Sequence, residues 1–233
     1  MAEPGTRGGR ARDANRARKA ILDAAEVVFA QHGFDGARVD AIASSSGYNS
    51  GLLFRYFGDK LGLYTEVLKR ADEEMSELLA RVFAPLLVDE TIASDAQRFR
   101  AFLTTTFGAF FDYMVDHPHV MRMFNWEQAE GWQTFAKIAS QFDPADLARL
   151  EALFSRARRA GLLRPDPDVV VMLVLVEQIC WSSPTALPLY QSLLAGRDFS
   201  SATVLAHVRE QIIAFLVAGI MSDAGGEELI ESR

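Results

Sequence analysis

The side chains that most often catalyse reactions are scattered along this sequence. Its four histidines and its single cysteine, Cys180, show no spacing that would set a nucleophile beside a base or gather the ligands of a metal ion. His117 and His119 flank a proline in an expected turn between helices. Cys180 stands in an apolar stretch, where a cysteine usually packs as a small hydrophobic side chain. We therefore predict no catalytic residue, no metal site and no cofactor, and we do not expect an enzyme.

Small polar residues at positions 49–51, Asn-Ser-Gly, would let the backbone approach DNA closely if they stood at the exposed start of a helix. A helix-turn-helix provides that placement, because its first helix braces the second so that the N-terminal residues of the second enter the major groove. Gly47 permits a tight turn, and apolar residues stand at the spacing needed to pack two short helices together: Ile42, Ala43, Leu53 and Phe57. On this geometry alone, an ordinary three-helix corner is an equally good interpretation.

The hydrophobic pattern around this motif is helical. Apolar residues recur every three or four positions from residue 16 to 32, and Gly33 follows where a glycine commonly ends a helix. Asn49 can cap the helix after the Gly47 turn, and Pro85 is expected to end the fourth helix. Beyond it the pattern stays helical without a convincing strand, which predicts an all-α fold. The predicted N-terminal helices are residues 16–32, 39–45, 49–57 and 60–84.

The charge of the chain is divided unevenly along its length. The net charge is −7, but residues 1–70 hold 11 Lys and Arg against 8 Asp and Glu, whereas residues 71–233 hold 13 against 23. The local field steers binding, so a basic end can approach phosphate while the acidic remainder stays away from it. Residues 1–15, rich in Gly, Arg and Ala and without periodicity, are expected to form a disordered basic arm.

The composition is typical of a soluble globular protein, with 49% hydrophobic and 24% charged residues. A single cysteine excludes an internal disulfide and fits a reducing cytoplasm. The basic first twenty residues lack the apolar stretch of a secretion signal. The longest aliphatic run, residues 169–176, is far shorter than the roughly 20 residues that cross a bilayer. We expect a cytoplasmic protein without a membrane partner.

Residues 21–68 closely resemble the DNA-binding domain of the tetracycline-repressor (TetR) family. The match includes Ile-Leu-x-Ala-Ala at residues 21–25, Phe-Ala-x-x-Gly-Phe at 29–34, Val-x-x-Ile-Ala at 39–43 and the recognition helix at 53–57. The resemblance implies an N-terminal three-helix DNA-binding domain at residues 16–62 and an all-helical ligand-binding and dimerisation domain at 63–233. It also implies a homodimer that binds double-stranded, palindromic operator DNA.

The resemblance assigns roles to residues of the recognition helix and its surroundings. Lys60 also makes independent sense, because a lysine near a helix N-terminus gains nothing from the helix dipole and favours a nearby anion. Ser50 and Leu52 replace the family's usual Lys and Thr, and Phe54 lacks the usual Tyr hydroxyl, so we expect arginines to supply the missing contacts. The implied base contacts are Tyr48, Asn49, Ser50 and Gly51, and the implied phosphate contacts are Arg38, Phe54, Tyr56 and Lys60. The arginines expected to supplement them are Arg38 and Arg55, with Arg10, Arg12, Arg16 and Arg18 of the arm.

By the same resemblance, the last two long helices, predicted at residues 166–184 and 200–221, dimerise as a four-helix bundle. The final helix has an apolar stripe wider than one packed face needs. Packing within its own subunit is the alternative explanation. The predicted interface residues are Leu205, Val208, Ile212, Phe215 and Leu216.

An aromatic and methionine-rich stretch in the middle of the chain suits a pocket for a small, apolar or aromatic effector. A plain hydrophobic core explains the same pattern. Glu177 is the most distinctive candidate, because a buried carboxylate needs a partner. The predicted ligand-binding residues are Phe107, Phe110, Phe111, Met114, Met123, Phe124, Trp126, Glu127, Trp132, Glu177 and Trp181.

The interpretation that unites these patterns is a repressor that a small molecule releases from its operator. The fourth helix, predicted at residues 60–84, is the natural lever between sensor and recognition helix. Two alternatives stay open on the sequence: a helical scaffold that keeps a non-functional helix-turn-helix, and a regulator of the same family that activates transcription.

Overall fold

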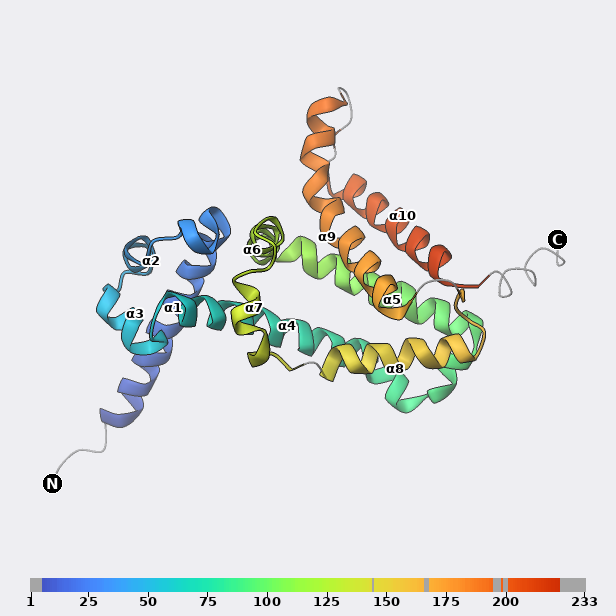
Figure 1. The fold of residues 1–233 in the computed structure, drawn as a ribbon, viewed down its shortest axis with the longest axis horizontal. Helices are drawn as coiled ribbons and strands as arrows, with labels where there is room; N and C mark the ends of the chain where they lie inside the picture. Colours follow the sequence, from blue (N-terminus) through green and yellow to red (C-terminus); the bar gives the residue numbers. More distant parts are fainter. Residues whose placement is uncertain (1–5, 144, 166–167, 195–197, 199–200, 223–233) are drawn as a thin grey trace. The chain divides into compact units, whose positions relative to one another are not determined.

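A computed structural model describes residues 6–143, 145–165, 168–194, 198 and 201–222. This part of the chain is helical and contains no strand beyond an isolated bridge between Leu163 and Met221, which confirms the all-α prediction (Figure 1). The helices are α1 (Thr6–Gly36), α2 (Val39–Ser46), α3 (Ser50–Phe57), α4 (Lys60–Val88), α5 (Ala96–Asp116), α6 (Pro118–Ala129), α7 (Phe135–Ile138), α8 (Ala145–Arg159), α9 (Val169–Leu193) and α10 (Ala202–Ile220), with short 3-10 turns η1 (Glu90–Ser94) and η2 (Ala139–Gln141).

Helix α1 begins ten residues earlier than predicted. It starts at Thr6, so residues 6–15 are helical where a disordered arm was expected, and residues 1–5 lie outside the described residues. The stretch contains Ala and Arg, which are strong helix formers, beside Gly8 and Gly9, which are not, and an Asp13–Arg16 ion pair of 2.9 Å closes one turn of it.

Two other helices run past the prolines at which they were expected to stop. Helix α4 continues through Pro85 to Val88, and α9 continues to Leu193. A proline already has a helical φ and removes one backbone hydrogen bond, so a last turn can follow it. The segments 170–182 and 185–193 of α9 are bent by 52°, as a proline inside a helix produces.

The chain forms two compact units that cut across the predicted domain boundary at residue 62. The first comprises residues 1–74 and 117–142. Its core joins Ile21 and Phe29 of α1 to Ile42 of α2 and Leu53 of α3, all at most 2% exposed, and it also includes Met123 of α6. The helix-turn-helix thus shares one hydrophobic core with residues from much later in the chain.

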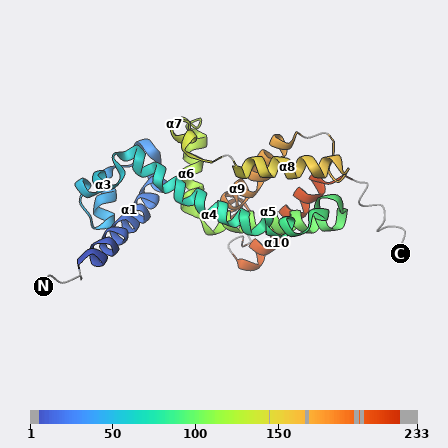
Figure 2. The ribbon, with the colours of Figure 1, turned by 90° about the horizontal axis from the view of Figure 1, so that it is seen from below.

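The second unit comprises residues 75–116 and 143–233, and α5 is its central helix. Helix α5 packs against α9 and α10, while α8 packs against α9 (Figure 2). Phe99, Leu103 and Phe154 are almost completely buried in its core. Each such side chain stabilises the fold by roughly 1.5–3 kcal/mol on transfer from water. Arg209 of α10 adds a bidentate ion pair to Asp112 of α5, with N–O distances of 2.6 and 2.7 Å.

Candidate DNA-binding surface

Helices α2 and α3 form the predicted helix-turn-helix. Arg38 precedes α2 in an extended conformation, and Gly47 ends the helix with φ 76° and ψ 15°. That left-handed conformation costs a glycine little, and it lets the backbone N–H of Tyr48 donate to Ala43 O at 3.2 Å. The turn between the helices therefore needs the glycine that the sequence provides.

The start of α3 is fixed by its own cap. Asn49 is the N-cap, as predicted, and its side-chain oxygen accepts a hydrogen bond of 2.9 Å from the Leu52 N–H. Leu53 and Phe57 anchor the other face of α3 in the core of the first unit. The cap and the buried anchors together define how the exposed face of α3 is oriented on the first unit.

The residues predicted to contact base edges lie together at the leading end of α3. Asn49 and Gly51 are exposed, whereas Tyr48 and Ser50 are half-buried. The Ser50 hydroxyl donates a 2.9 Å hydrogen bond to an Asp40 carboxylate oxygen on α2, a partner that the sequence did not indicate. Small polar groups and accessible backbone therefore form one continuous edge.

The predicted phosphate contacts flank this edge. Phe54 and Arg55 are exposed on α3, with Phe54 at 47%, and Arg38 is exposed before α2. Tyr56 is half-buried. Lys60, the first residue of α4, donates to the backbone oxygen of Asp35 at 3.2 Å and lies 4.7 Å from the centre of the Phe34 ring. The positive charge of Lys60 is thereby held near the end of α1.

A glycine that sequence reasoning missed sets the junction between α3 and α4. A Cβ atom added to Gly62 would stand only 2.0 Å from the backbone oxygen of Phe57. The Asp59 side chain caps the same junction, accepting from the Gly62 N–H at 2.7 Å. No side chain fits this approach, so Gly62 fixes how closely the end of the recognition helix meets α4.

Two of the arginines that were expected to supplement the phosphate contacts, Arg16 and Arg18, form ion pairs within the chain. Arg16 pairs with Asp13 at 2.9 Å. Arg18 pairs with Glu66 of α4 and lies 5.3 Å from the centre of the Phe57 ring. Arg12 is exposed, and the side chain of Arg10 lies outside the described residues. Arg18 thus braces the recognition helix rather than extending from a disordered arm.

Helix α6 packs directly on α1 at a second special glycine. Gly33 has φ 66°, and a Cβ there would lie 3.0 Å from the Trp126 ring of α6. The Trp126 indole N–H donates to Ala30 O at 3.3 Å. Trp126, a residue predicted to bind a ligand, contacts the helix that supports the recognition helix, and the buried Met123 belongs to the same core.

A buried carboxylate ties three elements of the first unit together. Glu127 of α6 is 1% exposed; one of its oxygens accepts from the Tyr64 hydroxyl of α4 at 2.7 Å, and the other accepts from the Phe135 N–H at 2.9 Å. Burial, and then the hydrogen bond to Glu127, raise the pKa of the Tyr64 hydroxyl far above its ordinary value, so it remains a donor. Glu127, another predicted ligand contact, therefore links α6 to α4 and to the start of α7 through its two hydrogen bonds.

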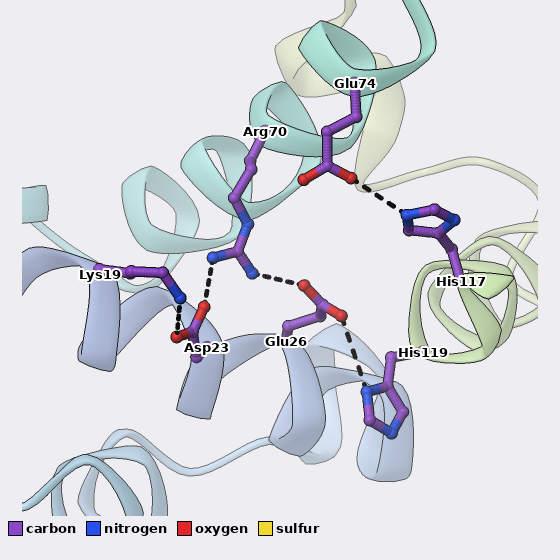
Figure 3. Close-up of polar contacts among 7 residues, drawn as sticks. All are labelled: Lys19, Asp23, Glu26, Arg70, Glu74, His117 and His119. Atoms are coloured by element: carbon purple, nitrogen blue, oxygen red, sulfur yellow. Dashed lines mark hydrogen bonds and ion pairs between the residues drawn. The ribbon is translucent and has the colours of Figure 1, made fainter. Parts of the chain in front are cut away.

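A polar network on the surface of the first unit also connects α6 to α4, and it includes α1 (Figure 3). The Arg70 guanidinium of α4 lies between Asp23 and Glu26 of α1, and its bond to Asp23 is 2.6 Å. His119 at the start of α6 faces Glu26 at 3.6 Å, and His117 faces Glu74 of α4 at 3.3 Å. These contacts hold the N-terminal end of α6 against both α1 and α4.

The eleven predicted ligand-binding residues are divided between the two units. In the first, Phe124 and Phe135 flank Trp132 at ring distances of 6.2 and 6.0 Å, and Trp132 has a left-handed φ of 61°. In the second, Phe107 and Phe111 belong to the hydrophobic core with Phe110 packed against it, and Met114 and Trp181 are also buried.

Glu177 differs from its prediction. It was expected to be buried, but it is exposed on α9. Desolvation by neighbouring atoms still raises the pKa of its carboxyl. Its apolar helix thus presents a carboxyl group at the surface of the chain instead of enclosing it in a core.

The predicted dimer residues of α10 fall on both of its faces. Leu216 is 4% exposed and belongs to the core of the second unit, which matches the alternative of packing within its own subunit. Phe215 is 69% exposed. Leu205, Val208 and Ile212 are half-buried. The neighbouring α9 exposes further large apolar side chains: Val170, Val171, Val174, Leu175, Leu189, Tyr190 and Leu193.

Among the described residues, α10 is one helix whose length and mean hydropathy of 1.5 would permit it to cross a membrane. Only the aliphatic run at residues 169–176 was considered from the sequence, which did not predict this property of α10. Ile213, Leu216, Val217 and Ile220 are buried in the second unit, and they are one side of a helix of which 22% is buried.

Comparison with known proteins decides the identity of this fold. The family model "Bacterial regulatory proteins, tetR family" matches residues 21–67, and the model "Tetracyclin repressor-like, C-terminal domain" matches residues 100–216. The chain belongs to the tetR family. The first match covers the helix-turn-helix with its bracing helices, and the second covers α5 to α10 apart from their outermost residues. The resemblance found in residues 21–68 is therefore confirmed and extends over the C-terminal helices.

Individual tetR-family relatives cover most of the chain. The HTH-type transcriptional repressor SCO4008 of Streptomyces coelicolor is 27% identical over 80% of this chain and 87% of its own. The HTH-type transcriptional activator FasR of Mycolicibacterium smegmatis is 30% identical over 68% of this chain and 67% of its own. The solved structure of SCO4942 from Streptomyces coelicolor has a TM-score of 0.61 and 27% identity, over 88% of this chain and 98% of that one.

These findings make the chain a DNA-binding transcriptional regulator of a soluble transcription-factor family. Members of this tetR family regulate transcription rather than catalyse reactions. The family match at residues 21–67 includes α2 and all of α3, with its cap at Asn49.

Proposed function

We propose that this chain is a homodimeric repressor, active in the cytoplasm, whose two recognition helices bind a palindromic operator and release it when a small apolar or aromatic molecule binds. The observation that carries the proposal is the leading end of α3. There Asn49 and Gly51 are exposed on a helix that is capped at its start and anchored through Leu53 and Phe57. A rigid helix with small exposed residues at its N-terminus suits insertion into the major groove.

The homodimer is supported by the apolar surface of α9 and α10. Val171, Leu175 and Phe215 are each more than half exposed, which a chain that works alone seldom tolerates over neighbouring helices. A second copy would cover this surface in a two-fold contact. Two copies are also what one short recognition helix needs to define a useful operator.

The effector is supported by the aromatic and methionine content of α5 and α9. Phe110 of α5 is only partly buried, and Met114 and Trp181 are large, adaptable or aromatic groups in the same unit. Such side chains accommodate flat or apolar molecules. Because Glu127, Met123 and Trp126 have structural partners in the first unit, the proposed contacts are those of α5 and α9.

The first experiment measures binding of the full chain to DNA from upstream of its own gene, by fluorescence anisotropy over a salt series. We expect sequence-selective binding that weakens steeply with salt, because phosphate contacts release counterions. Arg55→Ala should weaken binding to all sequences and lower the salt slope by about 1. Arg159→Ala removes an exposed arginine of α8 and serves as the matched control. Equal, weak binding to every DNA would refute the proposal and favour a helical scaffold.

A second experiment tests the dimer. Phe215→Glu places a charge on the exposed apolar surface of α10, and Ala152→Glu places the same charge on an exposed position of α8. Sedimentation should show a dimer for the unmodified chain and for Ala152→Glu, but a monomer for Phe215→Glu, which should also lose operator binding. A monomeric unmodified chain would contradict the proposal.

Activation is the second candidate, favoured by the name of the relative FasR. Both functions use the same DNA-binding surface, and a promoter–reporter assay separates them. Repression predicts higher reporter output when the gene for this chain is deleted, and activation predicts lower output.

A further inference from the structure

The partner of Ser50 bears on which bases α3 selects. Ser50 is the first residue of α3, and its hydroxyl oxygen lies 2.9 Å from an Asp40 carboxylate oxygen. Asp40 stands in the first turn of α2 and is exposed. The two side chains therefore meet at the leading end of the recognition helix, on the edge that would face DNA.

The direction of this hydrogen bond follows from the chemistry of the two groups. A serine hydroxyl has one proton to donate and two lone pairs, whereas a carboxylate can only accept. The Ser50 proton is thus committed to Asp40. The pair is left with lone pairs alone: those of the Ser50 oxygen and those of the second Asp40 oxygen.

In the major groove, a protein group that can only accept hydrogen bonds distinguishes between bases. Cytosine N4 and adenine N6 carry the hydrogen-bond donors there, whereas guanine N7 and O6 and thymine O4 are acceptors. Opposite the Asp40–Ser50 pair, C or A would form a charge-assisted hydrogen bond, and G or T would meet repelling lone pairs. The negative charge of Asp40 also disfavours phosphate, so it weakens binding to unselected DNA.

We propose that Asp40 is a specificity-determining residue: by accepting the Ser50 proton, it makes the Asp40–Ser50 pair at the start of α3 an acceptor that selects C or A in each operator half-site. The inference rests on the proposed DNA binding and adds what the bound sequence must contain. Asp40 acts partly through Ser50 and partly through its own free oxygen.

The test selects binding sequences from a pool of duplexes with a randomised centre, using the full chain and three variants. The unmodified chain should enrich C or A at one position of each half-site, with G or T there costing about tenfold in affinity. Asp40→Ala releases the Ser50 proton and should reduce this preference to about twofold, while raising affinity for all DNA because a negative charge is lost. Ser50→Ala, which keeps Asp40, should reduce the preference as well.

Asp35→Ala is the matched control, since it removes an exposed carboxylate at the end of α1, whereas the Ser50 hydroxyl donates to Asp40. It should change affinity and salt dependence without changing the selected base. If both Asp40→Ala and Ser50→Ala select the same bases as the unmodified chain, the Asp40–Ser50 inference is overturned and the pair only ties α2 to α3. If the unmodified chain enriches no sequence, the proposed function itself fails. Thermal unfolding of each variant identifies any loss of fold, and Ser50→Ala decides the matter if Asp40→Ala unfolds.

Discussion

Replacing Tyr64 by Phe tests whether the buried Glu127 carboxylate stabilises the first unit through its hydrogen bonds. Both residues are 1% exposed, and the Tyr64 hydroxyl donates to Glu127 at 2.7 Å. The phenyl ring of the variant keeps its packing against Phe29 and Phe34, whose ring centres lie 4.9 and 5.2 Å away. The substitution thus removes one donor and little volume.

The magnitude follows from what the lost donor leaves behind. A hydrogen bond to a charged group contributes about 1.5–3 kcal/mol, and the buried oxygen of Glu127 would lose its partner without gaining water. We expect Tyr64→Phe to lower the free energy of unfolding by about 2–3 kcal/mol. Glu127→Gln should also destabilise, because its amide N–H would face the Phe135 N–H, donor against donor, if its oxygen kept the bond to Tyr64.

The assay is urea unfolding followed by tryptophan fluorescence, since Trp126 and Trp132 both lie in the first unit. Tyr56→Phe is the matched control: the same hydroxyl is removed from a half-buried position of α3, and the expected change is within about 0.5 kcal/mol. A Tyr64→Phe variant as stable as this control would refute the reasoning, because it would mean that the Glu127 oxygen loses nothing with its donor.

Three further predictions concern single positions. Gly62→Ala should lower both stability and DNA affinity, measured by thermal unfolding and anisotropy, because its Cβ would stand 2.0 Å from a backbone oxygen of α3; unchanged affinity would show that α3 tolerates the shift. Cys180 should resist thiol reagents at pH 8 in the folded chain and react after unfolding, because burial raises the pKa of its thiol to about 12 and leaves almost no thiolate; rapid labelling of the folded chain would contradict this. Partial burial raises the pKa of Asp23, but hydrogen bonds from Lys19 and Arg70 outweigh this effect and lower the pKa overall. The ionised Asp23 therefore stabilises the fold at neutral pH, and this stabilisation is lost as the pH falls through the lowered pKa. In urea unfolding, Arg70→Gln should destabilise the chain most at pH 7 and least near pH 3, and an equal loss at both pH values would contradict the prediction.

The helix-turn-helix could be predicted from the sequence because its signals are local. Gly47 and Asn49 act on residues within one turn, and the apolar spacing from Ile42 to Phe57 defines the packed faces directly. The start of α9 was predicted at residue 166 and lies at Val169, where Asp168 caps the helix by accepting from the Val170 N–H. Capping, turn chemistry and periodicity all act over a few residues, so one sequence suffices to read them.

The contacts made by residues in the middle of the chain could not be predicted in this way. Trp126 and Glu127 look like pocket residues by type, and their actual partners, Gly33 and Tyr64, lie more than sixty residues earlier. The Asp40–Ser50 bond spans only ten residues, yet it depends on how two helices cross. Leu216 was predicted to lie in the dimer interface from the apolar stripe of its helix, and its place in the core of the second unit depends on residues far away in the sequence.

The docking of α6 on α1 has a consequence for exchanging sensors between regulators. Gly33 lies inside the N-terminal family match at residues 21–67, whereas Trp126 lies inside the C-terminal match at 100–216. A chimera joined between these matches would set a foreign sixth helix against Gly33 and would leave Tyr64 without its carboxylate. A transplantable DNA-reading head from this chain therefore consists of two segments, residues 1–74 and 117–142, and a hybrid regulator should inherit both from one parent.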